Sequence, residues 1–110
     1  MTALKRWTRD GKVVIVPTQG HTPGHVSVIV IVGDVSYFLA GDTSYTQQAL
    51  LEHQVDGVSP NKSEALRTLD RILAYARSVP TVYLPSHDPE SVERLNLTAT
   101  IQSKAATASH

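Results

Sequence analysis

The sequence predicts an α/β domain with α+β-type layers, in which a mixed sheet of about five strands carries helices on one face. Two observations predict this class. Short runs rich in Val and Ile, separated by Asp-Gly and Gly-Asp turns, fill the first part of the chain. A long segment of helical periodicity and one more short apolar run follow. Antiparallel hairpins followed by a helical crossover make a mixed sheet.

The strands are delimited by turn residues. Asp10-Gly11 is a strong hairpin signal, because both central positions of such a turn need positive φ. Gly33-Asp34 forms the next turn, after an apolar run that only Ser27 interrupts. We therefore expect strands at 4–9, 12–17, 26–32 and 35–40, and a last one at 81–85.

The remaining segments predict helices at 46–53 and 61–78 and a short one ending near residue 95. The longer helix is amphipathic, with an apolar stripe of Leu66, Leu69, Ile72, Leu73 and Ala76. Asn61 or Ser59 would cap it. Asp88 would be the N-cap of the last helix. We expect the domain to span 1–97 and the small polar tail 98–110 to be flexible.

The composition narrows the function classes. Lys and Arg balance Asp and Glu at 10 each, so neither a nucleic acid nor a membrane is an expected partner. The 110 residues contain no Cys, so a metal would need His and carboxylate ligands. The start lacks a secretory pattern and the longest apolar run is too short to span a bilayer, so we expect a soluble, cytoplasmic protein.

Three loops that adjoin strand ends carry residue types that bind metals: His25, Asp42 and His87. In the predicted topology the strands preceding these loops all run in the same direction, so their carboxyl ends share one edge of the sheet. Ligand sites in α/β sheets favour that edge. Imidazole and carboxylate groups are typical zinc ligands. The sequence thus predicts a shared metal site at this edge.

The motifs in these loops resemble the metallo-β-lactamase superfamily, in particular its N-acyl homoserine lactonase-like hydrolases. They are Gly-His-Thr-Pro-Gly-His at 20–25, Phe-Leu-Ala-Gly-Asp-Thr-Ser-Tyr at 38–45 and Leu-Pro-Ser-His-Asp at 84–88. The match runs from about Lys12 to Leu95 and covers the C-terminal half of the family's domain. The resemblance implies half of an αβ/βα sandwich and, in an intact site, a pair of zinc ions.

The resemblance also implies a role for each residue. His25 would bind the first metal, Asp42 would bridge both and His87 would bind the second. A metal-bound hydroxide would attack a lactone or ester carbonyl, with Asp42 and Tyr45 as catalytic residues. Tyr45 would donate a hydrogen bond to the developing oxyanion. His21, Gly41 and Asp88 would be structural residues near the site.

One family signature is missing. No His-x-His-x-Asp-His motif occurs, since the histidines are His21, His25, His53, His87 and His110. Each metal would keep about two protein ligands, whereas a catalytic zinc takes about three. We therefore expect a partial site, and an isolated chain that is inactive or weakly active.

Two alternatives stay open. The strand 26–32 is apolar on both faces, so a half-sandwich would expose an apolar sheet face. A non-catalytic truncated half-domain could self-associate through it, and we expect either a homodimer or a missing N-terminal half as partner. The other alternative is a weak metal-binding protein that uses His25, Asp42 and His87 in a single site. Each of these residues also has a purely structural interpretation. Asp42 could stabilise its turn, His87 could stabilise the start of the last helix, and Tyr45 could pack in the core.

Overall fold

The structure is a computed structural model, which describes residues 5–6, 12–19, 24–44, 46–52, 54 and 62–101. One mixed sheet contains the strands in sequence order: β1 (Lys5–Arg6), β2 (Val13–Pro17), β3 (Val26–Val32), β4 (Val35–Gly41) and β5 (Thr81–Pro85). The first four strands pair antiparallel, and β4 pairs parallel with β5. The predicted class and mixed sheet are confirmed, because the hairpin turns and the helical crossover impose this order.

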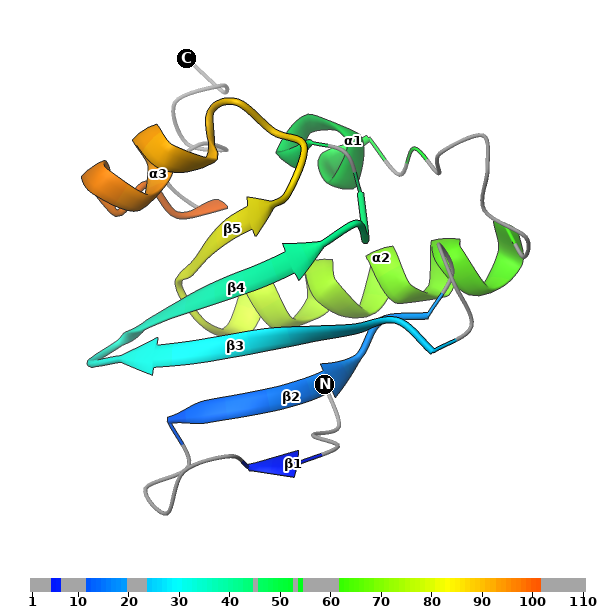
Figure 1. Cartoon of the computed structure of the whole chain (residues 1–110), viewed down its shortest axis with the longest axis horizontal. Coiled ribbons are helices and arrows are strands. Elements are labelled where there is room, and N and C mark those ends of the chain that lie inside the picture. The colour runs from blue at the N-terminus through cyan, green and yellow to red at the C-terminus, as the bar shows by residue number, and fades with distance from the viewer. Residues whose placement is uncertain are drawn as a thin grey trace.

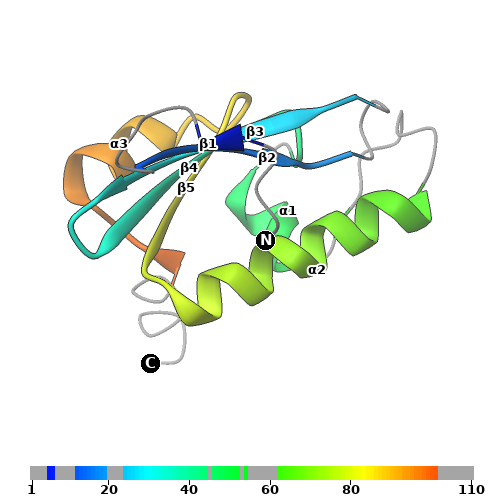
Figure 2. The same cartoon turned by 90° about the horizontal axis from the view of Figure 1, so that it is seen from below.

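The helices are α1 (Gln47–Leu51), α2 (Lys62–Ser78) and α3 (Ser91–Leu97). Figure 2 shows α1 and α2 on the same side of the sheet, with α2 running beneath the strands. The short α3 lies beside β5, against which it packs (Figure 1). In the described part of the chain, no helix is long and apolar enough to cross a membrane.

The core lies between the sheet and α2. Phe38 of β4 is at its centre, with ring centroids 6.3 Å from Tyr75 of α2 and 5.8 Å from Tyr83 of β5. Its other buried members are Val14, Val16, Ile29, Ala40, Leu50, Leu69, Ile72, Ala76 and Ile101. These residues come from both layers and from the segment after α3, so one continuous core fixes the helices to the sheet.

The predicted stripe of α2 is correct for Leu69, Ile72 and Ala76, which are buried, but wrong for Leu66, which is 38% exposed. The buried face is centred closer to Thr68, whose hydroxyl donates a hydrogen bond of 2.6 Å to the carbonyl of Gln19. Because this hydroxyl bonds to a carbonyl next to the sheet, Thr68 lies on the inward face of α2.

In the described part of the chain, α1 and α2 both lie on one face of the sheet (Figure 2), and the side chains on the opposite face are largely apolar. The strand register places Ile15 beside Val28, Val28 beside Leu39, and Leu39 beside Leu84. Leu39 is 43% exposed and Val32 at the end of β3 is 59% exposed. We call the residues of this row, with Val26, Val30 and Val32, the open sheet face. It has the character that the sequence predicted for a half-sandwich.

The start of the predicted flexible tail lies against the domain. Thr98 ends α3 in the left-handed conformation with φ 51°, and Thr100 and Ile101 are buried. Ile101 joins the core because its side chain is the one large apolar group after α3. Residues 102–110 and the expected caps of α2 at Asn61 or Ser59 lie outside the described residues.

Gln47 of α1 is 2% exposed, and among the described residues neither polar atom of its side-chain amide has a hydrogen-bond partner. An unsatisfied buried polar group costs about 1–3 kcal/mol. We therefore predict that Gln47→Met raises the free energy of unfolding by about 1 kcal/mol, measured by urea denaturation. Gln48→Met, at the exposed neighbouring position, is the control and should not stabilise the protein. A loss of stability in Gln47→Met would show that the amide is satisfied in solution.

Candidate metal-binding site

The carboxyl ends of β2, β4 and β5 lie at one edge of the sheet, as the directions of their arrows in Figure 1 show. The loops at this edge bring His25, Asp42 and His87 together. Asp42 Oδ1 lies 3.0 Å from His87 Nε2, and Asp42 N lies 3.2 Å from His25 Nε2. These three residues, distant in sequence, therefore meet at the edge of the sheet that the predicted strand directions indicated.

Asp42 and His87 suit a shared metal ion. Their side chains are 37% and 61% exposed, so an ion can reach both. Zinc ligands at about 2.0–2.2 Å in tetrahedral geometry lie about 3.3–3.6 Å from each other. The carboxylate oxygen and the imidazole nitrogen are in direct contact at 3.0 Å, so a small separation of the two side chains would reach that range. These two residues can supply two donors to one ion.

His25 is held differently. Its Nε2 accepts the amide hydrogen of Asp42, and its Nδ1 lies 3.0 Å from Thr18 Oγ1. An amide can only donate, so Nε2 carries no hydrogen and Nδ1 donates to the threonine. Both ring nitrogens are engaged within the protein. Across residues 12–19, 24–44, 46–52, 54 and 62–101, no group of three or more His, Asp or Glu side chains is arranged to hold a metal. The described residues alone therefore do not complete a zinc site.

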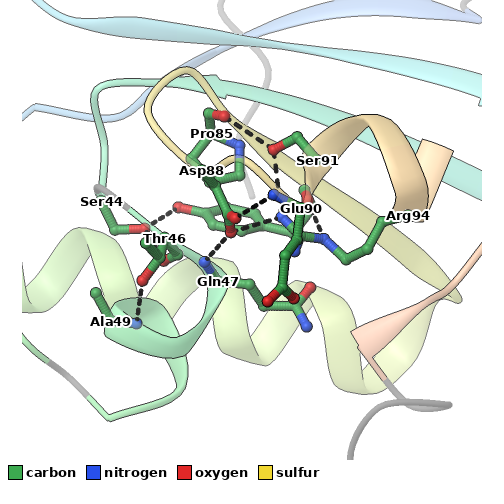
Figure 3. Close-up of polar contacts among 10 residues, drawn as sticks. Ser44, Thr46, Gln47, Ala49, Pro85, Asp88, Glu90, Ser91 and Arg94 are labelled. Atoms are coloured by element: carbon green, nitrogen blue, oxygen red, sulfur yellow. Dashed lines mark hydrogen bonds and ion pairs between the residues drawn. The ribbon is translucent and has the colours of Figure 1, made fainter.

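A buried carboxylate, Asp88, joins the loops that carry Asp42 and His87 (Figure 3). Its Oδ2 accepts the amide hydrogen of Gln47, the first residue of α1, at 2.9 Å, and also contacts Arg94 Nη2 at 2.9 Å. Its Oδ1 accepts from the amide of Glu90 at 2.9 Å. One side chain thus fixes the segment after β4 to the segment after β5.

The start of α3 differs from the prediction. The bond from Asp88 to the amide of Glu90 is the expected capping bond, but the regular helix begins at Ser91 rather than at Pro89. Arg94 makes a further contact with Asp88. Its guanidinium donates to Asp88 and to the carbonyl of Tyr83 at 3.0 Å, and this fixes α3 against β5. Asp88 therefore serves as an anchor for two elements and not only as a cap.

Burial alone would raise the pKa of Asp88, but the amides of Gln47 and Glu90 and the Arg94 guanidinium hold it below its ordinary value. Burial raises the pKa of Tyr83 far above its usual range. Ser44 Oγ donates to the carbonyl of Thr46, so Tyr83 donates to Ser44 at 2.8 Å. Asp88 is thus a fixed anion and Tyr83 a fixed neutral donor, and both have structural roles.

Other predicted site residues lie outside the described part of the chain. They are Tyr45 and His21. Gly41 is described, and its φ of +61°, which residues with a side chain rarely adopt, accounts for a glycine at this position. The hydroxyls of Thr18, Ser27 and Thr43 around His25 were not predicted. The single polar residue in the apolar run 26–32, Ser27, was the available signal.

The mixed sheet with its helices is similar to part of the metallo-β-lactamase-type fold, as found in N-acyl homoserine lactonase-like proteins. No protein-family model matches the chain. The N-acyl homoserine lactonase AttM of Rhizobium radiobacter is 26% identical over 83 residues, which are 74% of this chain and 32% of AttM.

Solved structures of N-acyl homoserine lactone hydrolases are also similar to this chain over part of their length. An N-acyl homoserine lactone hydrolase with the product N-hexanoyl-L-homoserine bound at its catalytic metal centre superposes with a TM-score of 0.69 at 23% identity, covering 84% of this chain and 36% of that one. A quorum-quenching N-acyl homoserine lactone hydrolase has a TM-score of 0.63 at 28% identity, covering 72% and 33%. The chain thus spans about a third of the length of the proteins it resembles.

Gly41 and Gly33 form a matched pair for testing the contact at the site. Both have positive φ, 61° and 59°, but an added Cβ at Gly41 would lie 3.0 Å from His25 Nε2, whereas one at Gly33 would meet nothing within 4 Å. Gly33→Ala should cost about 1 kcal/mol for the backbone alone. Gly41→Ala should cost at least about 1 kcal/mol more, because the new methyl also displaces His25. Urea denaturation of both variants measures the difference, and equal losses would mean that His25 does not lie against Gly41.

The Asp88–Arg94 pair should make stability depend on acid. Because the pKa of Asp88 is lowered by folding, its contribution is complete above the unfolded pKa of about 4 and is lost as the pH falls through the folded value. Asp88→Asn should cost about 3 kcal/mol near pH 7, since Arg94 is left buried and unpaired, and should flatten the acid dependence. Thermal unfolding from pH 7 to pH 3 tests this. The exposed turn residue Asp34, changed to Asn, is the control and should keep the wild-type profile.

Proposed function

We propose that this chain is the C-terminal part of a zinc-dependent hydrolase that opens N-acyl homoserine lactones or related esters. The observation that carries the proposal is the Asp42–His87 pair at the sheet edge, 3.0 Å apart and open to solvent, on a fold shared with proteins named as lactone hydrolases. Those proteins supply the substrate class, and the pair supplies the chemistry of metal binding.

In this proposal Asp42 and His87 hold the metal and residues outside the described part complete its ligand set. When bound, zinc supplies Lewis-acid polarisation of a carbonyl and lowers the pKa of a coordinated water. The contribution of this chain is to hold Asp42 and His87 in a fixed relation through Asp88, so that binding needs little rearrangement. Tyr45, on resemblance, donates a hydrogen bond to the reacting carbonyl, and the protein works in the cytoplasm.

The open sheet face supports the second part of the proposal, that another layer covers it in the working enzyme. Val28 and Leu39 are cross-strand partners on this face, and Leu39 is 43% exposed. An αβ/βα sandwich would place a second sheet there, which would also bring further ligands to the site edge. The occupant is the N-terminal half of such a sandwich, provided by a longer chain or by a separate one.

Zinc binding and lactone hydrolysis test the proposal directly. The zinc-loaded protein should hydrolyse N-hexanoyl-homoserine lactone above the buffer rate, slowly if the second layer is missing, as measured by liquid chromatography. Asp42→Asn and His87→Gln should each lower zinc affinity at least about tenfold, while Asp34→Asn should not. Tyr45→Phe should slow turnover and leave zinc affinity unchanged. A protein that retains no zinc and turns over no lactone would refute the proposal for this chain.

The alternative is a non-catalytic half-domain that self-associates, and the same open sheet face favours it. Sedimentation velocity distinguishes the two. A zinc-free dimer that Leu39→Lys dissociates, and that Leu97→Lys on α3 leaves intact, would support self-association. A monomer that binds zinc through Asp42 and His87 would support the hydrolase.

A further inference from the structure

Behind His25 lies a cluster of buried hydroxyl groups. Thr18 Oγ1 lies 3.0 Å from His25 Nδ1 and 2.8 Å from Ser27 Oγ. Ser27 Oγ also donates to the carbonyl of Ala40 at 3.2 Å. Thr18 and Ser27 are each 1% exposed, so water does not compete for these bonds. In a cluster this buried, each hydrogen has to be assigned to a partner within the protein.

The carbonyl of Ala40 fixes the direction in which the hydroxyls donate. The pairing of β4 with β5 is irregular between Leu39 and Gly41, where Ala40 lies, and the carbonyl of Ala40 accepts from side chains. A carbonyl can only accept, so the bond between Ser27 and Ala40 uses the single hydrogen of the serine hydroxyl. Ser27 therefore has no hydrogen left to donate to Thr18.

This direction determines which ring nitrogen of His25 carries the hydrogen. Thr18 donates to Ser27, so the oxygen of Thr18 accepts from His25 and the ring hydrogen lies on Nδ1. Nε2 keeps its lone pair and lies 3.2 Å from the backbone nitrogen of Asp42, at the edge of the sheet that carries the candidate site. The main chain supports the same placement, because Thr18 N donates to the carbonyl of His25 at 3.0 Å.

The same form of the ring suits the protein with and without a metal. In the metal-free structure Nε2 accepts the amide hydrogen of Asp42, and zinc binding by His25 would use the same lone pair. The bond from Nδ1 to Thr18 is on the other nitrogen and is compatible with both states. Histidines that bind metals commonly donate the hydrogen of their second nitrogen to a fixed acceptor, which sets the form and orientation of the ring.

We infer that Thr18 and Ser27 are positioning residues, whose buried hydroxyls hold His25 in the Nδ1–H form and leave its Nε2 lone pair available at the site edge. The inference rests on the proposed function, in which the resemblance makes His25 a ligand of the first metal and Asp42 the bridge to the second. The two hydroxyls act through the imidazole. Removal of such partners commonly lowers metal affinity about tenfold to a hundredfold.

Nuclear magnetic resonance of the ring nitrogens tests the hydroxyl chain in the zinc-free protein, at a pH where the imidazole is neutral. Wild-type His25 should be in the Nδ1–H form. Thr18→Val has a similar shape but no hydroxyl, so it should shift the balance at least about fivefold toward the Nε2–H form. Thr18→Ser loses a buried methyl group but keeps the hydroxyl, and it should keep the wild-type form. A wild-type ring in the Nε2–H form, or no shift in Thr18→Val, would overturn the inference.

A second variant, Ser27→Ala, removes the acceptor of the Thr18 hydrogen. Thr18 can then donate to His25, so the two ring forms should mix. Ser36→Ala is the matched control, because Ser36 is also a buried serine of the sheet but contacts Tyr75 Oη at 2.7 Å. This control should leave the ring form unchanged. Equal shifts in both variants would show that the ring responds to a general loss of packing and would overturn the inference.

Zinc titration tests the link to the metal site. Thr18→Val and Ser27→Ala should each bind zinc about tenfold more weakly than the wild type, whereas Thr18→Ser and Ser36→Ala should stay within about threefold. Zinc should also shift the Nε2 resonance of wild-type His25 and leave the hydrogen on Nδ1. Unchanged affinity in Thr18→Val would overturn the positioning role. A wild-type protein that binds no zinc would refute the proposed function, whereas the ring form in the zinc-free protein still decides the role of the hydroxyls.

Discussion

The buried carboxylate of Asp88 is the constraint on which the site depends. Asp42 follows β4 and His87 follows β5, and the parallel pairing of these strands places the two loops side by side without fixing their tips. Asp88 fixes them, because it accepts from the first amide of α1 and from Arg94 of α3. A charged group that is this buried is stable only with all its partners in place. The geometry of the site and the docking of two helices are therefore coupled.

The second constraint is the asymmetry of the sheet. Within the described residues, α1 and α2 cover one face (Figure 2), while the open sheet face presents apolar side chains that include the exposed Val26, Val32 and Leu39. The candidate metal site is also incomplete within the described residues, which supply two metal donors, Asp42 and His87, rather than the three protein ligands of a catalytic zinc site. Both observations agree with a chain that spans about a third of the lactone hydrolases it resembles. A second layer would cover the face and complete the edge together.

The strands, their directions and the edge of the site were predictable from local patterns. The turn residues Gly33-Asp34 predicted the hairpin of β3 and β4, and the periodicity of 61–78 predicted the crossover helix. Asp10-Gly11, the other predicted turn, lies outside the described residues. Predictions failed where a polar anchor outweighs an apolar pattern. On α2 the buried Thr68 donates to the carbonyl of Gln19 on the inward face, while Leu66 is 38% exposed. A second prediction failed at Ile101. This residue lies in the expected flexible tail but is buried in the core, which no local sequence pattern indicates.

The sequence by itself determined the class of fold and that His25, Asp42 and His87 would meet at one edge, because strand order and direction follow from short-range signals. Only the tertiary structure decided how these residues differ. The side chains of Asp42 and His87 face each other and solvent, whereas both nitrogens of His25 are bonded within the protein. The reason is physical: a histidine's role depends on which groups meet its two nitrogens, and here those groups are Thr18 and the Asp42 amide, which follow the ends of β2 and β4.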